Sequence, residues 1–526
     1  MSVKYFSKTT LYSPWFLAAG PLIISMFFIS PLISEYTLTI ENGPSFPVPY
    51  TFSDLDSDGI SETVFTSKGV PYYNVVALTY NDLYIDQWNL SDSLSPSISG
   101  LFFGDYDMDK LQEVYVFSHK QDSLFLNVKE FMDPGGLLLE RVFITNIGYS
   151  NGEVAATLFP IALFDQNGDG HSEFYFSITS YFRLGPRKIY SYDIKNRELH
   201  SSQVSGSIIL YPEMVDADGD NRPEIYGLSS ASGNYPRATP YSDSSAWFMV
   251  FDENLKFKFK PVEFPGFTSG VTAKSYSKGR FKGYVVLSTN SSIDTLKAKT
   301  GVWIFSGQGK LINHRPLREI TGISITSLIV TKDGSNDRIF VAGNDIYELN
   351  DSLEVIRTID LPFNSKSIYH IADIDGDNKD EIIIYSYEVG KLFVYNSRFM
   401  KLMEKDFNFN SLSWETCRHY SNEKKYSLFL KAGESNYFLN FKYNRYYLAG
   451  FLVYPGVYFS LVLFILLIRK ITITHVEQRE KLNQRLLTLQ LQGIKSQLDP
   501  HFTFNSLNSI ASLIYLEERK NAYDYL

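Results

Sequence analysis

Asp54-Leu-Asp-Ser-Asp58-Gly-Ile-Ser-Glu62 is the first of five similar stretches that recur along the middle of the chain. In each stretch an acidic or amide residue stands at the first, third, fifth and ninth position. Alternate residues of a tight loop can turn their oxygens toward one point, and hard cations such as Ca²⁺ prefer oxygen ligands. The repeat therefore predicts five Ca²⁺-binding loops, and the predicted ligands are Asp54, Asp56, Asp58, Glu62, Asp105, Asp107, Asp109, Glu113, Asp165, Asn167, Asp169, Glu173, Asp216, Asp218, Asp220, Glu224, Asp373, Asp375, Asp377 and Glu381.

The sixth position of these stretches favours a left-handed backbone. It is Gly59 or Gly170 in two loops and Asn221 or Asn378 in two others, and these residue types adopt positive φ most easily. Lys110 occupies this position in the second stretch, which makes that loop the weakest of the five predictions. The alternative interpretation of the repeat is a set of solvated acidic turns without metal.

Each stretch is followed by a short run of β-branched and aromatic residues, such as Val114-Tyr-Val-Phe117 or Ile382-Ile-Ile-Tyr385. Short apolar runs also precede the stretches, and both features are typical of β-strands. An EF-hand has similar spacing of acids, but it requires flanking helices and a Glu at the twelfth position. The loops are therefore predicted to join the two strands of a β-hairpin.

The repeats begin at residues 54, 105, 165, 216 and 373, so the last interval spans about three ordinary ones. Two degenerate repeats are predicted inside it, at Ser275–Gly283 and Val330–Arg338, which brings the count to seven. A further degenerate copy ends near Lys425 and is either an eighth unit or part of the ring closure. Periods of about 50 residues with four short strands each predict a mainly β fold, a β-propeller of about seven blades.

The five loops resemble the FG-GAP/VCBS repeats of integrin α-type propellers. That resemblance implies seven blades and Ca²⁺ held between strands at the blade edges. We expect such ions to brace the hairpins rather than to act as the sensed signal. The ligand of the propeller is not identified by the sequence.

Two uncharged runs flank this region. Trp15–Ile33 has nineteen residues, close to the ~20 that a spanning helix needs, and follows Lys4 and Lys8. Because cytoplasmic flanks carry the excess of Lys and Arg, the N-terminus is predicted to be cytoplasmic. A cleaved signal peptide is the competing interpretation, but no Ala-x-Ala-like site ends the run.

The second run, Tyr447–Ile468, is followed at once by Arg469-Lys470, which returns the chain to the cytoplasm. The predicted location is the inner (cytoplasmic) membrane, crossed twice, with the propeller outside and both termini inside. The predicted segments are a tail (1–14), a first membrane helix (15–33), the propeller (34–446), a second membrane helix (447–468), a helical linker (469–495) and a helical segment (496–526).

Composition narrows the class of protein further. Apolar residues make up 44% and aromatic residues 16% of the chain, with 40 Phe and 37 Tyr, which favours packed sheets. The net charge of −9 gives no reason to expect a nucleic-acid partner. Cys417 is the single cysteine, so an internal disulfide framework is excluded.

The inner segment is predicted to be helical, because no Gly or Pro occurs from Ile471 to Gln492. Leu487, Leu491, Ile494 and Leu498 have the spacing of a packing seam, which favours a parallel homodimer. Pro500 is expected to interrupt the helix beside His501.

Ser496 to Ile510 reads Ser-Gln-Leu-Asp-Pro-His-Phe-Thr-Phe-Asn-Ser-Leu-Asn-Ser-Ile. Asp499 and Pro500 suit the start of a helix, and a neutral His501 offers a nucleophilic ring nitrogen near neutral pH. On a helix, one stripe would hold His501, Asn505, Asn508 and Ser512. An apolar face for a partner helix would hold Phe504, Leu507, Ile510, Ala511 and Ile514.

This stretch resembles the phosphoacceptor segment of LytS/YehU-type sensor histidine kinases, the internal region histidine kinase family. The residues that carry the resemblance are Gln497, Pro500, His501, Phe502, Phe504, Asn505, Leu507, Asn508 and Ile510. It implies that His501 is autophosphorylated, with Asn505 in support, and that a response regulator receives the phosphoryl group. The implied activity is that of a protein-histidine kinase.

Such kinases continue with a second helix and an ATP-binding domain that holds ATP and Mg²⁺, and the printed sequence contains neither in full. Residues 517–526 are expected to open the second helix. We therefore expect either a piece of a longer kinase or a chain whose His501 is phosphorylated by another chain. The alternative function, from a different class, is a membrane-anchored Ca²⁺-binding propeller for adhesion or ligand binding, without kinase activity.

Overall fold

The computed structural model describes the greater part of the chain. Its described residues are 12–29, 36–43, 50–68, 72–79, 83–95, 97–98, 100–131, 133, 136–150, 153–180, 185–235, 238–266, 268–290, 300–316, 327–343, 345–362, 368–374, 377–406, 412–414, 427–432, 435–497 and 500–516. They form two compact units, one from Glu35–Asn444 and one from Met1–Ser34 with Arg445–Leu526. Several residues used above lie outside the described ones: Lys4, Lys8, Asp375, Cys417, Lys425, Leu498, Asp499 and 517–526.

The larger unit is built from antiparallel sheets, as the sequence predicts for a mainly β fold. In the described residues five sheets have four strands each, and eleven strands between Ile208 and Ile359 pair into one continuous sheet. The first sheet contains β2 (Tyr50–Ser53), β3 (Glu62–Lys68), β4 (Tyr73–Leu78) and β5 (Tyr84–Leu90). The second contains β6 (Phe102–Gly104), β7 (Glu113–Lys120), β8 (Ser123–Glu130) and β9 (Leu137–Asn146). The third contains β12 (Ala156–Phe164), β13 (Glu173–Ser180), β14 (Arg187–Asp193) and β15 (Glu198–Ser201). A small ribbon of β10 (Tyr149–Ser150) and β11 (Glu153–Val154) precedes the third.

The next four units continue the pattern. The fourth pairs β16 (Ile208–Val215), β17 (Glu224–Ser230) and β19 (Val250–Phe251), with β18 (Ser245–Phe248) on β20 (Val262–Pro265). The fifth unit contains β21 (Ser269–Lys278), β22 (Phe281–Asn290), β23 (Gly301–Ser306) and β24 (Leu311–Pro316). The sixth contains β25 (Ser327–Asp333), β26 (Asn336–Ala342), β27 (Ile346–Leu349) and β28 (Val355–Ile359). The seventh contains β29 (Ile368–Ala372), β30 (Glu381–Ser386), β31 (Lys391–Tyr395) and β32 (Lys401–Asp406).

The number of units differs from the predicted seven, because the described strands form an eighth. It contains β33 (Leu412–Trp414), β34 (Ser427–Ala432), β35 (Ser435–Tyr443) and, from the other end of the chain, β1 (Tyr36–Asn42). The degenerate copy near Lys425 therefore precedes β34 of a real unit, and that unit also closes the ring. The sequence left open whether this copy is an eighth unit or part of the ring closure, and the sheet is both.

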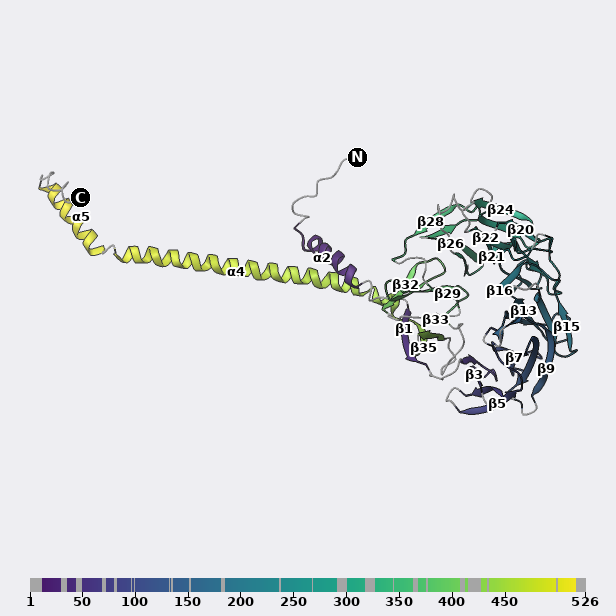
Figure 1. The fold of residues 1–526 in the computed structure, drawn as a ribbon. Helices are drawn as coiled ribbons and strands as arrows, with labels where there is room; N and C mark the ends of the chain where they lie inside the picture. Colours follow the sequence, from purple (N-terminus) through teal and green to yellow (C-terminus); the bar gives the residue numbers. More distant parts are fainter. Residues whose placement is uncertain are drawn as a thin grey trace. The chain divides into compact units, whose positions relative to one another are not determined.

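The hydrophobic core consists of eight clusters in the described residues, and each lies between consecutive units. The cluster between the second and third units holds Tyr115 and Phe174, and the one between the eighth and first holds Phe429 and Phe52. The other clusters join the remaining pairs of neighbours in order. Figure 1 shows the sheets following one another around a ring, with β5, β9 and β15 toward its outside and β16 toward its inside. This is the architecture of a β-propeller.

The strand after each acidic loop begins with a run that is buried on both faces, because it lies between two neighbouring sheets. β13 is buried along its whole length, and so is β30. This explains why those strands are continuous apolar runs rather than alternating ones. The loops join β2 to β3, β6 to β7, β12 to β13, β16 to β17 and β29 to β30, which confirms the predicted hairpins. The two degenerate repeats are also hairpins, β21–β22 and β25–β26.

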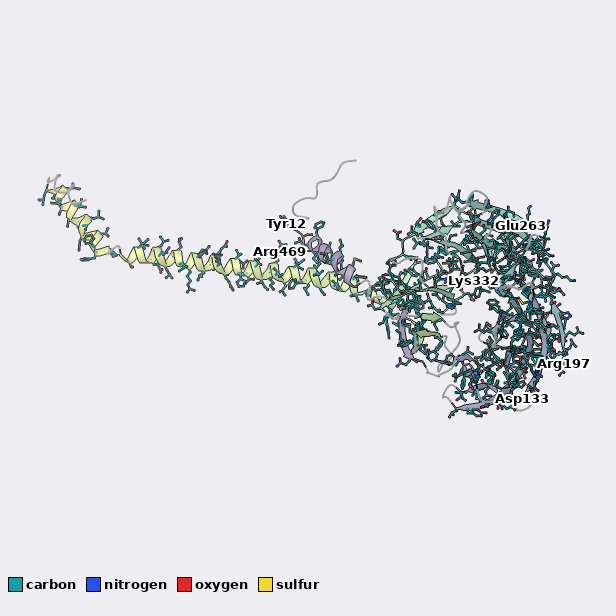
Figure 2. The ribbon with its side chains drawn as sticks, in the orientation of Figure 1. Tyr12, Asp133, Arg197, Glu263, Lys332 and Arg469 are labelled. Atoms are coloured by element: carbon teal, nitrogen blue, oxygen red, sulfur yellow. The ribbon has the colours of Figure 1, made fainter. Side chains whose placement is uncertain are left out.

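The smaller unit is helical: α2 (Pro14–Ile29), α3 (Tyr447–Gly450), α4 (Val453–Gln497) and α5 (Pro500–Tyr515). The ring of Trp15 lies 6.3 Å from that of Phe459, and the Tyr458 hydroxyl donates to the Trp15 carbonyl at 3.0 Å, so α2 packs against α4. α4 continues through Arg469, labelled in Figure 2, as one helix of 45 residues.

Within the described residues, one helical segment is long and apolar enough to cross a membrane, Tyr447–Ser496, with a mean hydropathy of 2.4 in its most apolar window. α2 is apolar but has 16 residues, fewer than the predicted run of 15–33, and residues 30–35 lie outside the described ones. The second crossing therefore stays a prediction.

Candidate functional site

The phosphoacceptor candidate His501 lies in the first turn of α5. That helix begins at Pro500, where a missing N–H costs no helical hydrogen bond. α4 ends at Gln497 and α5 begins at Pro500. The two residues between them lie outside the described ones, so the interruption expected at Pro500 stays a prediction. Asn505 follows one turn later, and its amide Nδ2 lies 2.8 Å from Nδ1 of His501. Of the predicted polar stripe, these two side chains are brought together, whereas the Ser512 hydroxyl donates to the Ser509 carbonyl.

The amide of Asn505 controls which ring nitrogen of His501 carries the proton. In the structure the amide nitrogen of Asn505 faces the ring and donates to Nδ1, and the proton of a neutral imidazole is then on Nε2. Amide oxygen and nitrogen exchange by a simple flip of the side chain. In the flipped arrangement the amide oxygen accepts from Nδ1–H, and the nucleophilic lone pair is on Nε2.

The surface of α5 is open to a partner. His501 and Asn505 are exposed, and so are the apolar side chains Phe502, Phe504 and Leu507, with exposed fractions of 59–70%. A stable helix of this kind normally buries its apolar face against another element. Leu487, Leu491 and Ile494 of α4 are likewise exposed. Both helices therefore present apolar side chains that a second chain could cover.

The five acidic loops share one hydrogen-bond pattern in the larger unit. The first carboxylate accepts from the sixth N–H at 2.9–3.2 Å. The fifth carboxylate accepts from the seventh N–H at 2.7–3.0 Å. The buried Glu at the ninth position accepts through Oε2 from the second N–H at 2.7–3.1 Å. Backbone N–H groups thus orient the carboxylates in the same way in all five loops.

The sixth position is left-handed in all five loops, as the sequence predicts. Gly59 has φ 90° and Asn221 has φ 67°. Lys110 also adopts the conformation, with φ 81°, although its side chain makes it less favourable. The second loop therefore keeps the common shape despite the substitution.

The first two loops have the oxygens that a hard cation requires. Carboxylate oxygens of Asp54, Asp56 and Asp58 lie within 4.8 Å of one another, and the same holds for Asp105, Asp107 and Asp109. Buried oxygens without a hydrogen-bond partner among the described residues occur in both loops: Asp54 Oδ1, Asp107 Oδ1 and Glu113 Oε1.

Burial, together with the nearby carboxylates, raises the pKa of Glu62 to about 7 and that of Glu113 to about 8. A dense group of buried carboxyls with orphan oxygens fits a bound Ca²⁺.

The third and fourth loops fit a cation less well, because other donors reach the same oxygens. In the third, the Asn167 amide donates to Glu173 Oε1 at 3.0 Å, and the Lys195 ammonium lies 3.0 Å from Asp169. In the fourth, Asp216, Asp218 and Glu224 also converge, but Lys258 contacts two of them. In the fifth, Lys379 pairs with Asp377 at 2.6 Å, and Asp375 lies outside the described residues.

The contacts of Lys195 and Lys258 with the acidic loops could not be predicted from the repeat itself. Lys195 and Lys258 lie in later turns of the same units, far from the acidic stretches in the sequence. No spacing rule connects them to the loops they enter.

Comparison with known proteins gives one family match. Residues 489–526 match the family model described as histidine kinase, a segment that contains the end of α4, α5 and His501. The match supports the coarse assignment of this segment to a histidine kinase. No curated protein matches the chain significantly.

Among solved structures, BBS1N in complex with ARL6DN, soaked with lead, is 9% identical with a TM-score of 0.38, covering 78% of this chain and 98% of that chain. The Neurospora crassa Pan2 WD40 domain is 11% identical with a TM-score of 0.34, covering 77% and 95%. The AfRom2 CNH domain is 9% identical with a TM-score of 0.33, covering 66% and 97%. Because these TM-scores are low, the assignment of the fold rests on the strand pairing described above and not on these structures.

Proposed function

We propose that this chain is the sensing and phosphoacceptor part of a membrane histidine kinase of the LytS/YehU kind. The observation that carries the proposal is the family match over 489–526, in which His501 is exposed on α5 and hydrogen-bonded to Asn505. The partner that receives the phosphoryl group is a response regulator. The phosphoryl group comes from ATP, which a catalytic domain binds together with Mg²⁺. The printed sequence does not contain such a domain in full.

The chemistry assigned to this chain is a single nucleophilic step. The Nε2 lone pair of His501 attacks the γ-phosphorus of ATP, a nitrogen–phosphorus bond forms, and the bond to the ADP oxygen breaks. In the proposed reactive state the Asn505 side chain is flipped, so that its amide oxygen accepts from Nδ1–H and holds the imidazole in the tautomer whose Nε2 lone pair attacks. Transfer to a response-regulator aspartate then restores the free imidazole.

The proposed signal path uses the continuity of α4. This helix extends from Val453 in the apolar segment past Arg469 to Gln497 without interruption, and Figure 1 shows it as a single rod followed by α5. A rotation or shift of its apolar part is therefore transmitted along its length. The interruption predicted at Pro500 is proposed to convert that movement into a change in the position of His501. The propeller is proposed to lie outside the inner membrane and both termini in the cytoplasm.

Cysteine crosslinking tests the proposed homodimer. In a Cys417→Ser background, Leu487→Cys and Leu491→Cys are expected to form disulfide-linked dimers in membranes, because both lie on the predicted seam. Gln492→Cys, which lies away from that seam on the helix, is the matched control and is expected to crosslink several-fold less. Absence of dimers at every position from 476 to 494 would contradict the proposed arrangement.

We also propose that Ca²⁺ binds the first two loops and braces their hairpins. Removing Ca²⁺ with a chelator is expected to lower the melting midpoint of the propeller by several degrees, because an ion that binds only the folded state stabilises it. Asp107→Asn, which removes one ligand charge of the second loop, is expected to shrink the shift. The measurement is thermal unfolding followed by tryptophan fluorescence. An unchanged midpoint at millimolar Ca²⁺ would refute Ca²⁺ binding.

The second candidate function is a membrane-anchored Ca²⁺-binding propeller for adhesion or ligand binding. It is favoured by the size of the propeller unit, Glu35–Asn444, relative to the helical unit. It gives no role to the pair of His501 and Asn505, which is why the kinase is preferred. Phosphorylation of His501 separates the two candidates.

A further inference from the structure

The fourth acidic loop already contains a cation supplied by the chain itself. The Lys258 ammonium lies 2.9 Å from Asp218, 3.0 Å from Asp220 and 2.7 Å from Glu224. The side chains of Asp218 and Glu224 are 6% and 1% exposed, so two of these contacts are shielded from water. Lys258 follows β19, and its N–H donates to the Val250 carbonyl at 2.9 Å, which fixes the root of the side chain.

The oxygen that Lys258 contacts is the one that varies among the loops. Glu224 Oε2 accepts from a backbone N–H, as the ninth residue does in every loop. Its Oε1 takes the Lys258 ammonium. The matching Oε1 takes the Asn167 amide in the third loop and has no partner in the second, where Glu113 is fully buried. One position is thus filled by an ammonium in the fourth loop and by an amide in the third, and in the second no group of the described residues fills it.

Lys258 also carries the positive charge that is needed to replace a bound cation. Its ammonium donates to carboxylates of Glu224, Asp218 and Asp220, so a positive charge already occupies the point at which their oxygens converge. A divalent cation at the same point would meet a fixed positive charge within hydrogen-bond distance of its ligands, and repulsion at that distance is strong in a partly buried site.

We propose that Lys258 replaces a divalent cation in the fourth loop, and that this loop is a latent cation site which opens when the ammonium is removed. The ligands of the opened site are Asp216, Asp218, Asp220 and Glu224. The prediction of how many ions the native chain binds rests on the proposed Ca²⁺ binding by the first two loops. The lysine replacement itself does not.

Lys258→Met tests the inference directly, since methionine keeps the length of the stem and removes the charge. The full chain in detergent is produced in millimolar Ca²⁺, so that an opened site is filled during folding, and bound Ca²⁺ is counted by equilibrium dialysis. Lys258→Met is expected to bind one more Ca²⁺ per chain than the native protein. Lys258→Met combined with Glu224→Gln is expected to lose that additional ion.

Lys256→Met is the matched control, because Lys256 is exposed on the same turn and no acidic loop contact is made by its ammonium among the described residues. It is expected to leave the count unchanged. An equal count in the native protein and in Lys258→Met would overturn the inference, and so would a Lys258→Met protein that stays unfolded in Ca²⁺. A native protein that binds no Ca²⁺ beside a variant that binds one would refute the first two sites and keep the inference.

Discussion

His501→Gln is expected to abolish histidine phosphorylation in the product of the complete coding sequence incubated with ATP and Mg²⁺. Glutamine keeps a polar side chain of similar reach but has no nucleophilic ring nitrogen. His501 is exposed on α5, so the substitution removes no packing and the fold is expected to persist. The measurement is the acid-labile phosphate retained on the protein after a single turnover.

His475→Gln is the matched control for this experiment. His475 is also exposed and also lies on a helix, α4, but outside the matched motif. It is expected to retain full labelling. Labelling that survives in His501→Gln would show that another group accepts the phosphoryl group.

Leu439→Ala is expected to destabilise the propeller by about 2–5 kcal/mol, the usual cost of a cavity left by a buried leucine. Leu439 is fully buried in β35, opposite Ile40 of β1 and Leu428 of β34. The lost contacts therefore weaken the sheet that closes the ring. The measurement is urea unfolding followed by tryptophan fluorescence.

Lys442→Ala controls for a change in the same strand. Lys442 is exposed in β35, and its partner Thr37 bonds to its backbone carbonyl, which alanine keeps. Its expected effect on the free energy of unfolding is small. Equal destabilisation by both substitutions would contradict the assignment of Leu439 to the core of the closing sheet.

The closing sheet matters for function because it joins both ends of the propeller. β1 follows α2 in the sequence, across residues 30–35, and β35 precedes α3 and α4. Tyr36 and Tyr443 are paired in register, with their rings 5.9 Å apart. A ligand that shifts these two strands would act on both connections to the helical unit at once.

The sequence predicted the hairpins and their loops well because the determining interactions are local. The sixth residue of each loop, such as Gly59 or Asn378, needs a left-handed backbone, and the carboxylates bond to amides a few residues away. The strands after the loops could be read from their continuous apolar runs. Each of these signals lies within one stretch of the chain.

The strand that the other end of the chain adds to the eighth unit and the lysine contacts were not predicted, because they depend on residues distant in sequence. The pair Tyr36 and Tyr443 joins the two ends of the propeller, and no local pattern marks it. Lys258 lies in a later turn of the chain and contacts Glu224 of the fourth acidic loop. Lys256, the same residue type two positions earlier, makes no such contact among the described residues. The carboxylate spacing is thus equal in loops whose surroundings differ in charge.

The hydropathy pattern located the apolar runs but not the ends of the helices. α4 continues from the apolar segment through Arg469 into the polar region as one helix, because no Gly or Pro occurs from Ile471 to Gln492. The contact between Trp15 and Phe459 arises from packing of two helices, which hydropathy does not report.

The central claim is most directly tested by locating the phosphoryl group on the protein. The product of the complete coding sequence, reconstituted in membranes, is incubated with ATP and Mg²⁺, digested at neutral or alkaline pH and mapped by mass spectrometry. The account predicts an acid-labile phosphate on His501, which disappears when a purified response regulator is added. An absence of phosphate on the His501 peptide, or a stable phosphate on serine or threonine alone, would contradict it.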